Sequence, residues 1–358
     1  MPSAAEPIPA VSQRLEDFLR RRMEEAASWG QTVTLMASDA AGAVAGGKRL
    51  RARFCLAGSS AVGAADGEDS VVVGVSAALE IFHAAALVHD DLIDNSDRRR
   101  GRPAAHRAWE QRHSSLRWRG DAAAFGRSAA VLIGDLLVAW SDDLLEEALA
   151  RADPSRGAAA RREYAAMRRE VTVGQFLDIA GEARSFAGSG GAQAALRVAS
   201  MKSARYSVEQ PLVIGAALGG ASSDQVAALR RFGHPLGMAF QLRDDLLGVF
   251  GNAELTGKPA GDDLREGKQT LLVAFAREAL SAEEWRQADA MIGDRGLDEA
   301  GVHRVQRWII QSGAPERVEA VIAGYAAQAQ RALDAAPLAA PAVAELRDLA
   351  RAAISRQA

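Results

Sequence analysis

The stretch "VVVGVSAALEIFHAAALVHDDLID", residues 71–94, runs through eighteen almost entirely apolar residues and then places a histidine and three aspartates within six positions. Its β-branched start continues into an Ala/Leu-rich run of helical length, which favours a helix. Length alone would also allow a membrane span, but Glu80 and His83 interrupt the run and acidic residues follow it at once. We therefore predict a buried core helix with carboxylates at its C-terminal end and no membrane span.

Apolar residues at helical spacing recur along the chain, and no segment reads convincingly as alternating β-structure. The predicted helices cover residues 11–27, 45–62, 70–94, 128–150, 158–181, 192–219, 224–250, 268–280, 283–291, 298–312, 315–334 and 341–356. We find no internal repeat and no low-complexity linker. We expect an all-α protein of about a dozen helices, forming a single domain over residues 1–358 with a flexible tail at residues 1–10.

The overall charge excludes a general attraction to nucleic acid. The chain of 358 residues carries 46 acidic and 43 basic side chains, a net charge of -3, so any anion binding must be local. A single cysteine, Cys55, excludes an internal disulfide framework and agrees with a reducing compartment. Because the first thirty residues lack the pattern of a signal peptide, we expect a cytoplasmic protein.

Only four of the 43 basic residues are lysine, and all the others are arginine. The four are Lys48, Lys202, Lys258 and Lys268. Lysine is a compact, flexible point charge that suits a phosphate oxygen where a planar guanidinium does not fit. A chain so biased to arginine indicates that its remaining lysines have specific tasks.

Asp90 and Asp94 are four residues apart, which places both carboxylates on one helix face, where they repel each other. The negative end of the helix dipole adds to this conflict, and a hard divalent cation such as Mg²⁺ would remove it. Taken alone, the D-D-x-x-D pattern fits a metal site and a solvated helix end equally well.

A second acidic pair, Asp244 and Asp245 in "FQLRDDLLGVFG", ends another predicted apolar helix. Arg99 and Arg100 follow the first pair, and lysines follow the second. Facing acidic walls with cations beside them predict a pocket that binds Mg²⁺ and diphosphate groups above an apolar cavity.

Six ordered blocks make a resemblance specific: "GGKRLRA" at 46–52, "HDDLIDNSDRRRG" at 89–101, "GQFLD" at 174–178, "MKSARY" at 201–206, "FQLRDDLLG" at 240–248 and "GKPAGDDLREGKQTLL" at 257–272. From about residue 45 to 275 the chain resembles the trans-isoprenyl diphosphate synthases, the polyprenyl synthetase family, in particular those that make geranylgeranyl diphosphate. All four lysines fall inside these blocks. The resemblance implies an isoprenoid synthase-type helical bundle and a Mg²⁺-dependent prenyltransferase that joins isopentenyl diphosphate to an allylic diphosphate.

The resemblance also implies roles for individual residues. Three Mg²⁺ ions would be held on two walls by Asp90, Asp94 and Asp244, assisted by Asp91, Asp245 and Asp263. The allylic diphosphate would be gripped by Arg99, Lys202, Gln241, Lys258 and Lys268, and Ser203 would be a further substrate-binding residue. Asp178 would pair with Lys202. A separate site for isopentenyl diphosphate would contain Lys48, Arg51, His83 and Arg100.

Product length should depend on what blocks the growing prenyl tail. Four, five and eight residues before Asp90 stand Ala86, Ala85 and Phe82, which a helix places toward the same side. Family members that make fifteen-carbon products often have an aromatic residue at the four- or five-back position, and this chain has none. With Phe82 as the floor, we expect a twenty-carbon product, geranylgeranyl diphosphate; a farnesyl or a longer polyprenyl product remains the alternative.

Two other functions share part of this pattern. A class I terpene cyclase has an acidic first motif but normally a different second metal motif, and it lacks the second diphosphate site. A noncatalytic subunit of a heteromeric synthase often loses its acidic pairs, which are intact here.

The resemblance further implies a homodimer, and the polar loop at 251–268 is a candidate lid.

Overall fold

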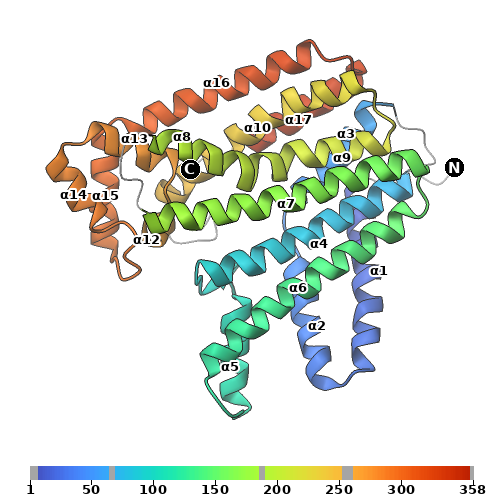
Figure 1. Ribbon diagram of the computed structural model, residues 1–358, viewed down its shortest axis with the longest axis horizontal. Helices are drawn as coiled ribbons and strands as arrows, with labels where there is room; N and C mark the ends of the chain where they lie inside the picture. Colours follow the sequence, from blue (N-terminus) through green and yellow to red (C-terminus); the bar gives the residue numbers. More distant parts are fainter. Residues whose placement is uncertain (1–6, 64–68, 185–189, 252–260, 355–358) are drawn as a thin grey trace.

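The computed structural model describes residues 7–63, 69–184, 190–251 and 261–354, and these are helical almost throughout (Figure 1). The N-terminal half consists of α1 (Pro7–Ala27), α2 (Gln31–Val44), α3 (Leu50–Ala61), α4 (Asp69–Ile93), α5 (Ala105–Ser115), α6 (Ala122–Leu149) and α7 (Pro154–Arg184). The C-terminal half consists of α8 (Gly191–Val198), η2 (Ala199–Glu209), α9 (Gln210–Leu218), α10 (Ser223–Phe250), α12 (Asp262–Glu266), α13 (Leu271–Ala279), α14 (Ala282–Asp289), α15 (Glu299–Gln311), α16 (Ala314–Asp334) and α17 (Ala340–Ile354). In the described residues, the β-structure is one short antiparallel ribbon of β1 (Arg98–Arg99) and β2 (Arg102–Pro103). The all-α prediction is confirmed.

The apolar stretch at 71–88 forms the greater part of α4, which lies in the core as predicted. α4 packs against α1, α2, α3 and α6, and side chains such as Val75, Leu79 and Ile81 are fully buried. Among the described residues, two helices are long and apolar enough to cross a membrane: 78% of the apolar window of α4 is buried inside the protein, but only 28% of that of α6 is. The apolar character of α4 is thus explained by packing, and that of α6 only in part, through buried side chains such as Ile133 and Leu137.

Two helices of the N-terminal half were not predicted, because neither shows a strong apolar stripe of its own. α2 has no side-chain cap at Gly30 and packs between α1, α4 and α6. α5 is mostly polar, but it buries Trp109, His106 and His113 and lies along α6. Tertiary packing stabilises both helices where the local sequence pattern is weak.

Two predicted boundaries on the N-terminal side were wrong. Residues 45–49 do not continue α3, since Gly46, Gly47 and Arg49 all have positive φ angles that a right-handed helix excludes. Residues 7–10 of the expected tail already belong to α1, and residues 1–6 lie outside the described residues.

The helix predicted over residues 192–219 is divided into α8, the π-helix η2 and α9. η2 packs between α7 and α10, and its eleven residues carry the "MKSARY" block. The backbones of α7 and η2 approach closely at Gly174, where a Cβ atom would lie 2.4 Å from the backbone nitrogen of Lys202. The glycine of "GQFLD" therefore lets η2 sit against α7 and brings the two blocks together.

Candidate active site

The six sequence blocks converge on one cavity of about 840 Å³, bordered by α3, α4, α7, η2, α10 and α12. Predicted site residues that line it are Lys48, Arg51, His83, Ala86, Asp90, Asp94, Arg99, Arg100, Asp178, Lys202, Ser203, Gln241, Asp244, Asp245, Asp263 and Lys268. Asp91, Phe82 and Ala85 are not among the lining residues. Lys258 and half of the predicted lid, residues 252–260, lie outside the described residues, although the end of that segment forms α12.

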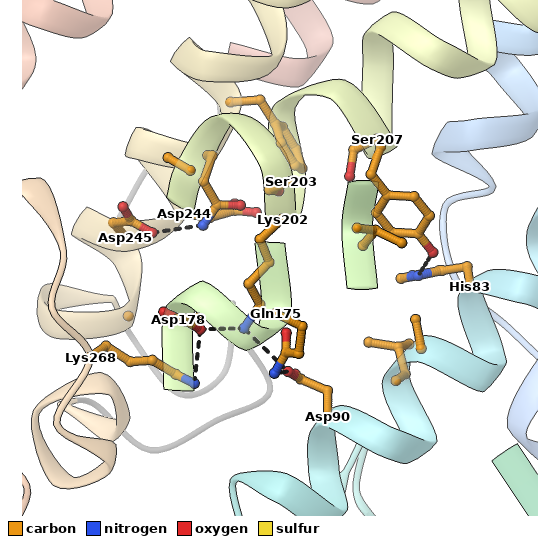
Figure 2. Close-up of a pocket in the computed structure, with 18 of the residues that line it drawn as sticks. His83, Asp90, Gln175, Asp178, Lys202, Ser203, Ser207, Asp244, Asp245 and Lys268 are labelled. Atoms are coloured by element: carbon orange, nitrogen blue, oxygen red, sulfur yellow. Dashed lines mark hydrogen bonds and ion pairs between the residues drawn. The ribbon is translucent and has the colours of Figure 1, made fainter. Parts of the chain in front are cut away.

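The first acidic wall of the cavity, on α4, is joined to two lysines. The ammonium group of Lys202 donates to Asp178 Oδ2 at 2.6 Å and to Asp90 Oδ1 at 3.3 Å. Lys268 donates to Asp94 Oδ2 at 2.9 Å. Figure 2 shows Asp90 pointing from α4 toward the lysines, with Asp178 of α7 between the two ammonium groups. The predicted pairing of Asp178 with Lys202 is confirmed.

These pairs keep both lysines charged although they are largely buried. Burial opposes the charged form of Lys202, but Asp90 and Asp178 raise its pKa above the ordinary value. For Lys268 burial also opposes charge, and Asp94 and Asp178 raise the pKa far more than burial lowers it. The cavity therefore presents fixed ammonium groups at its acidic wall.

Asp91 of the first motif has a different partner. It is buried and accepts hydrogen bonds from Nε of Arg99 at 2.8 Å and from Nη2 of the same guanidinium. Arg99 Nη2 also lies 3.7 Å from Asp90 Oδ2. Asp91 thus orients Arg99 toward the cavity, and its predicted part in metal binding stays a prediction.

The second acidic wall comes from the C-terminal end of α10. Gln241 donates a hydrogen bond of 2.7 Å to Asp245, and burial together with the neighbouring charge of Asp263 raises the pKa of Asp245 to about 8. A Cβ atom added to Gly248 would lie 1.9 Å from Asp263 Oδ2. Gly248 therefore makes room for the carboxylate of Asp263, which comes from α12.

Magnesium fits the chemistry of these two walls, whose candidate ligands are all carboxylate oxygens. Within the described residues, no three acidic, histidine or cysteine side chains converge closely enough to hold an ion by themselves. Mg²⁺ is commonly held through one or two carboxylates, with waters and substrate phosphates in the remaining positions. The two walls do not form a closed cage of protein ligands. They fit a Mg²⁺ ion whose coordination shell is completed by a bound diphosphate. Burial and neighbouring carboxylates raise the pKa of Asp245, and a cation bound nearby would oppose this shift by favouring the ionised form.

A second group of cations lies on the α3 side of the cavity. Arg51 is only 9% exposed; it donates to Ser207 Oγ at 2.7 Å and stacks on the Tyr206 ring at 4.1 Å. Its Nε is buried without a hydrogen-bond partner, and no acidic side chain of the described residues forms an ion pair with it. Arg100 donates to the Ala45 carbonyl at 2.8 Å. A buried guanidinium without a counterion indicates a site for an anion.

His83 belongs to this second group as a neutral side chain. Its Nδ1 shares a hydrogen bond of 3.2 Å with the Tyr206 hydroxyl. Burial and then the charges of Arg51 and Arg100 lower the pKa of His83 well below its ordinary value. It can therefore donate one hydrogen bond to a ligand but adds no charge.

Sequence reasoning missed several polar residues that line the cavity, among them Glu80, Gln175, Tyr206 and Ser207. Gln175 donates to Asp90 Oδ1 at 3.1 Å and lies within the quoted "GQFLD" block. Tyr206 ends the "MKSARY" block, and Ser207 follows it. For Glu80 the available signal was an acid inside an otherwise apolar run.

Comparison with known proteins agrees with this geometry. The family model described as "Polyprenyl synthetase" matches residues 34–309. The chain belongs to the polyprenyl synthetase family. The predicted resemblance is thereby confirmed, and with it the class of enzyme, a trans-prenyltransferase.

Three relatives show which members of the family this polyprenyl synthetase is similar to. It is 29% identical to a short chain isoprenyl diphosphate synthase of Methanothermobacter thermautotrophicus, covering 90% of this chain and 91% of that protein. It is 34% identical to a chloroplastic geranylgeranyl pyrophosphate synthase of Capsicum annuum, covering 63% of this chain but only 56% of that protein. A crystal structure of geranylgeranyl pyrophosphate synthase from Corynebacterium glutamicum, complexed with isoprenyl diphosphate and magnesium, superposes with a TM-score of 0.91 at 35% identity, covering 98% of each chain.

Proposed function

We propose that this polyprenyl synthetase joins isopentenyl diphosphate head to tail (1'-4) to an allylic diphosphate and releases geranylgeranyl diphosphate. One observation carries the proposal: a single cavity holds two anion sites of different construction. One site combines carboxylate walls with lysines, and the other is the cationic group around the buried Arg51, which forms no ion pair within the described residues. Two diphosphate substrates require two such sites.

The first site would bind the allylic diphosphate. Asp90, Asp94 and Asp244 would hold Mg²⁺, three ions in all as the family resemblance implies, with Asp245 and Asp263 supporting the second wall. When bound, Mg²⁺ supplies positive charge for the departing diphosphate. Arg99, Lys202 and Lys268 line the cavity beside the first wall, and Lys258, Gln241 and Ser203 complete the proposed grip.

The charge of these side chains would promote cleavage of the C1–O bond of the allylic substrate. Diphosphate leaves with the electron pair, so its negative charge grows as an allylic carbocation forms. Each cation about 4 Å from that charge contributes on the order of 4 kcal/mol at an effective dielectric constant near 20, before desolvation costs. The lysines are held in place before the reaction, so they need little reorganisation in the transition state.

The second site would hold isopentenyl diphosphate through Arg51, Arg100, Lys48 and a hydrogen bond from His83. The double bond of this substrate then attacks C1 of the cation, forming a carbon–carbon bond, and a proton is lost to restore a double bond. We assign no side chain as the base, and the released diphosphate takes that proton. Apolar walls exclude water, which would otherwise trap the cation.

The apolar end of the cavity would set the product length. Phe82 is buried and packs edge to face against Tyr206, which lines the cavity, and against Tyr164 behind it. Ala86 lines the cavity one turn closer to Asp90, and Ala85 is fully buried away from it. Phe82 lies about 6 Å deeper than Ala86 by helix rise, which supports room for a twenty-carbon product.

Replacing Phe82 with alanine is expected to lengthen the product by at least one five-carbon unit, because the tail can then enter the space of the lost ring. Product sizing by chromatography, with isopentenyl diphosphate in excess, measures the change. Phe232→Leu is the matched control: Phe232 is a buried phenylalanine in a different core cluster from Phe82 and Tyr206, so its substitution should lower stability without changing product length. An unchanged product from Phe82→Ala would mean that Phe82 is not the floor.

We further propose that the enzyme is a cytoplasmic homodimer in which a second copy covers α6 and α7. α6 exposes Val131 and Leu132, and α7 exposes Val173 and Phe176, apolar side chains that a second copy would cover. The Arg168–Asp142 and Arg161–Glu146 ion pairs join the two helices in antiparallel order.

Light scattering in solution should give about twice the 37.8 kDa of one chain. The double substitution Leu132→Glu and Phe176→Glu should shift the mass toward that of a monomer, because charges would be buried in the interface. Ile310→Glu changes an equally exposed apolar residue on α15 and should leave the mass unchanged. A monomeric wild-type protein would contradict the dimer.

The proposed reaction is tested by incubating the purified protein with Mg²⁺, labelled isopentenyl diphosphate and each allylic primer in turn. Label should enter a twenty-carbon diphosphate. Release of cyclic or linear hydrocarbons without use of isopentenyl diphosphate would instead favour a class I terpene cyclase, and no turnover at all would favour a noncatalytic subunit. Retained acidic walls and the second cationic group argue against both alternatives.

A further inference from the structure

Glu80 is a buried acid in a part of the cavity that otherwise gathers cations. It is 5% exposed, lies on α4 and lines the cavity together with Lys48, Arg51 and Arg100. It stands ten residues before Asp90, which is about 15 Å along a helix, so it does not belong to the acidic wall. A negative charge at this place would weaken the binding of an anion by repulsion. Its presence therefore needs another explanation.

The first oxygen of Glu80 caps α3 from a neighbouring helix. Oε1 accepts the backbone N–H of Ala52, in the first turn of α3, at 3.1 Å. The N-cap residue of α3, Arg49, has φ 52° and ψ 42° and offers no side-chain capping hydrogen bond. The free N–H groups at a helix start favour a negative charge and need an acceptor. Glu80 supplies both from α4.

The second oxygen of Glu80 holds the residue that begins α3. Oε2 lies 3.6 Å from Nη1 of Arg49 in a pair that is almost completely withdrawn from solvent. The same Nη1 donates to the Val44 carbonyl, the last residue of α2, at 2.9 Å. Arg49 thus ties the end of α2 and the start of α3 to α4, in a left-handed backbone conformation that persists only where the surroundings impose it.

We propose that Glu80 and Arg49 are positioning residues for the isopentenyl diphosphate site, a proposal that rests on the proposed function. Lys48 lies in the segment that the pair fixes, and Arg51 lies in the first turn of the helix that Glu80 caps. Neither Glu80 nor Arg49 touches the substrate in this proposal. They set where Lys48 and Arg51 present their charges.

The direction in which the KM for isopentenyl diphosphate changes distinguishes a positioning role of Glu80 from a purely electrostatic one. Glu80→Gln removes the negative charge but keeps an oxygen that can accept from Ala52. If Glu80 acted on the substrate only through its charge, this substitution would lower the KM for isopentenyl diphosphate. Because we assign it a positioning role, we expect this KM to rise about tenfold, while the KM for the allylic diphosphate and kcat change less than twofold.

Arg49→Lys tests the other partner and serves if Glu80→Gln does not fold, since it keeps the charge but removes the guanidinium whose Nη1 contacts both Glu80 and Val44. It should raise the same KM, and the double variant should be no worse than the more affected single variant. Asp39→Asn is the matched control, because it removes the Asp39–Arg112 ion pair on α2, away from the cavity. It should leave both KM values unchanged.

An unchanged or lowered KM for isopentenyl diphosphate in both variants would overturn the proposal. A parallel rise in the KM values of both substrates would also overturn it, because it would indicate a general loss of structure. These results differ from failure of the proposed function, in which the wild-type enzyme itself would not elongate an allylic primer.

Discussion

Asp90→Asn is expected to lower kcat by about a thousandfold, the upper end of what the loss of one preorganised stabilising group costs an enzyme. Asp90 has two tasks in the proposed reaction. It is a proposed magnesium ligand, and its Oδ1 receives hydrogen bonds from Lys202 at 3.3 Å and Gln175 at 3.1 Å. Asparagine keeps the shape but removes the charge that balances Lys202 and Arg99.

The consequence should be visible in the magnesium dependence of the steady-state rate. Lys202, Lys268 and Arg99 hold the pKa of Asp90 below its ordinary value against the effect of burial, so the wild-type carboxylate is charged throughout the neutral range. In the variant, more Mg²⁺ should be needed for half-maximal rate, and saturating Mg²⁺ should not restore the wild-type kcat.

Asp97→Asn is the matched control for this experiment. Asp97 belongs to the same sequence block, but its carboxylate is largely exposed and pairs with Arg107 at 2.8 Å. Its substitution should change kcat less than twofold, since an exposed ion pair contributes little. Nearly full activity of Asp90→Asn would remove the acidic wall of α4 from the mechanism.

Arg51→Gln is expected to raise the KM for isopentenyl diphosphate about a hundredfold, with little change in the KM for the allylic substrate. Truncating one partner of a buried, hydrogen-bonded charge pair typically costs about 2–5 kcal/mol, and each tenfold change corresponds to about 1.4 kcal/mol. Arg51 is buried, its Nε has no hydrogen-bond partner in the part of the chain that the structure describes, and its Nη2 donates to Ser207. Its charge is therefore directed at a ligand.

Arg112→Gln provides the control, because Arg112 also lies over an aromatic ring, that of Trp109, at 4.5 Å. Arg112 pairs with Asp39 and does not line the cavity. Both KM values should therefore be unaffected. Equal rises in the two KM values for Arg51→Gln would mean that the two diphosphates do not occupy separate sites.

Much of the candidate site could be predicted because it depends on the spacing of residues that are close together in the sequence. Asp90 and Asp94 are one helical turn apart, so a single helix decides that their carboxylates share a face. The scarcity of lysine is enough to single out Lys202 and Lys268, and both line the cavity. The partners of these lysines were harder to find, since the contact between Lys268 and Asp94 joins residues 174 positions apart.

The errors in the predicted fold also arise because contacts between segments far apart in the sequence are not visible in local patterns. α5 carries few apolar residues, yet it is stable because Trp109 and its neighbours pack against α6. The π-helix η2 depends on its close packing between α7 and α10, and no periodicity within residues 199–209 signals it. In the sequence Glu80 is only an interruption of an apolar run, because its partners Ala52 and Arg49 lie in another part of the chain.

By itself, the sequence determined the all-α class, the core position of α4, the family and the residue types of the two proposed diphosphate sites. These features follow from helical periodicity and from motifs that each lie within about sixteen residues. Only the tertiary structure decided that Asp91 orients Arg99, that Asp263 occupies the space beside Gly248, and that Glu80 caps α3. Each of these depends on where a side chain meets another segment, and that meeting is fixed by the packing of whole helices and not by local sequence.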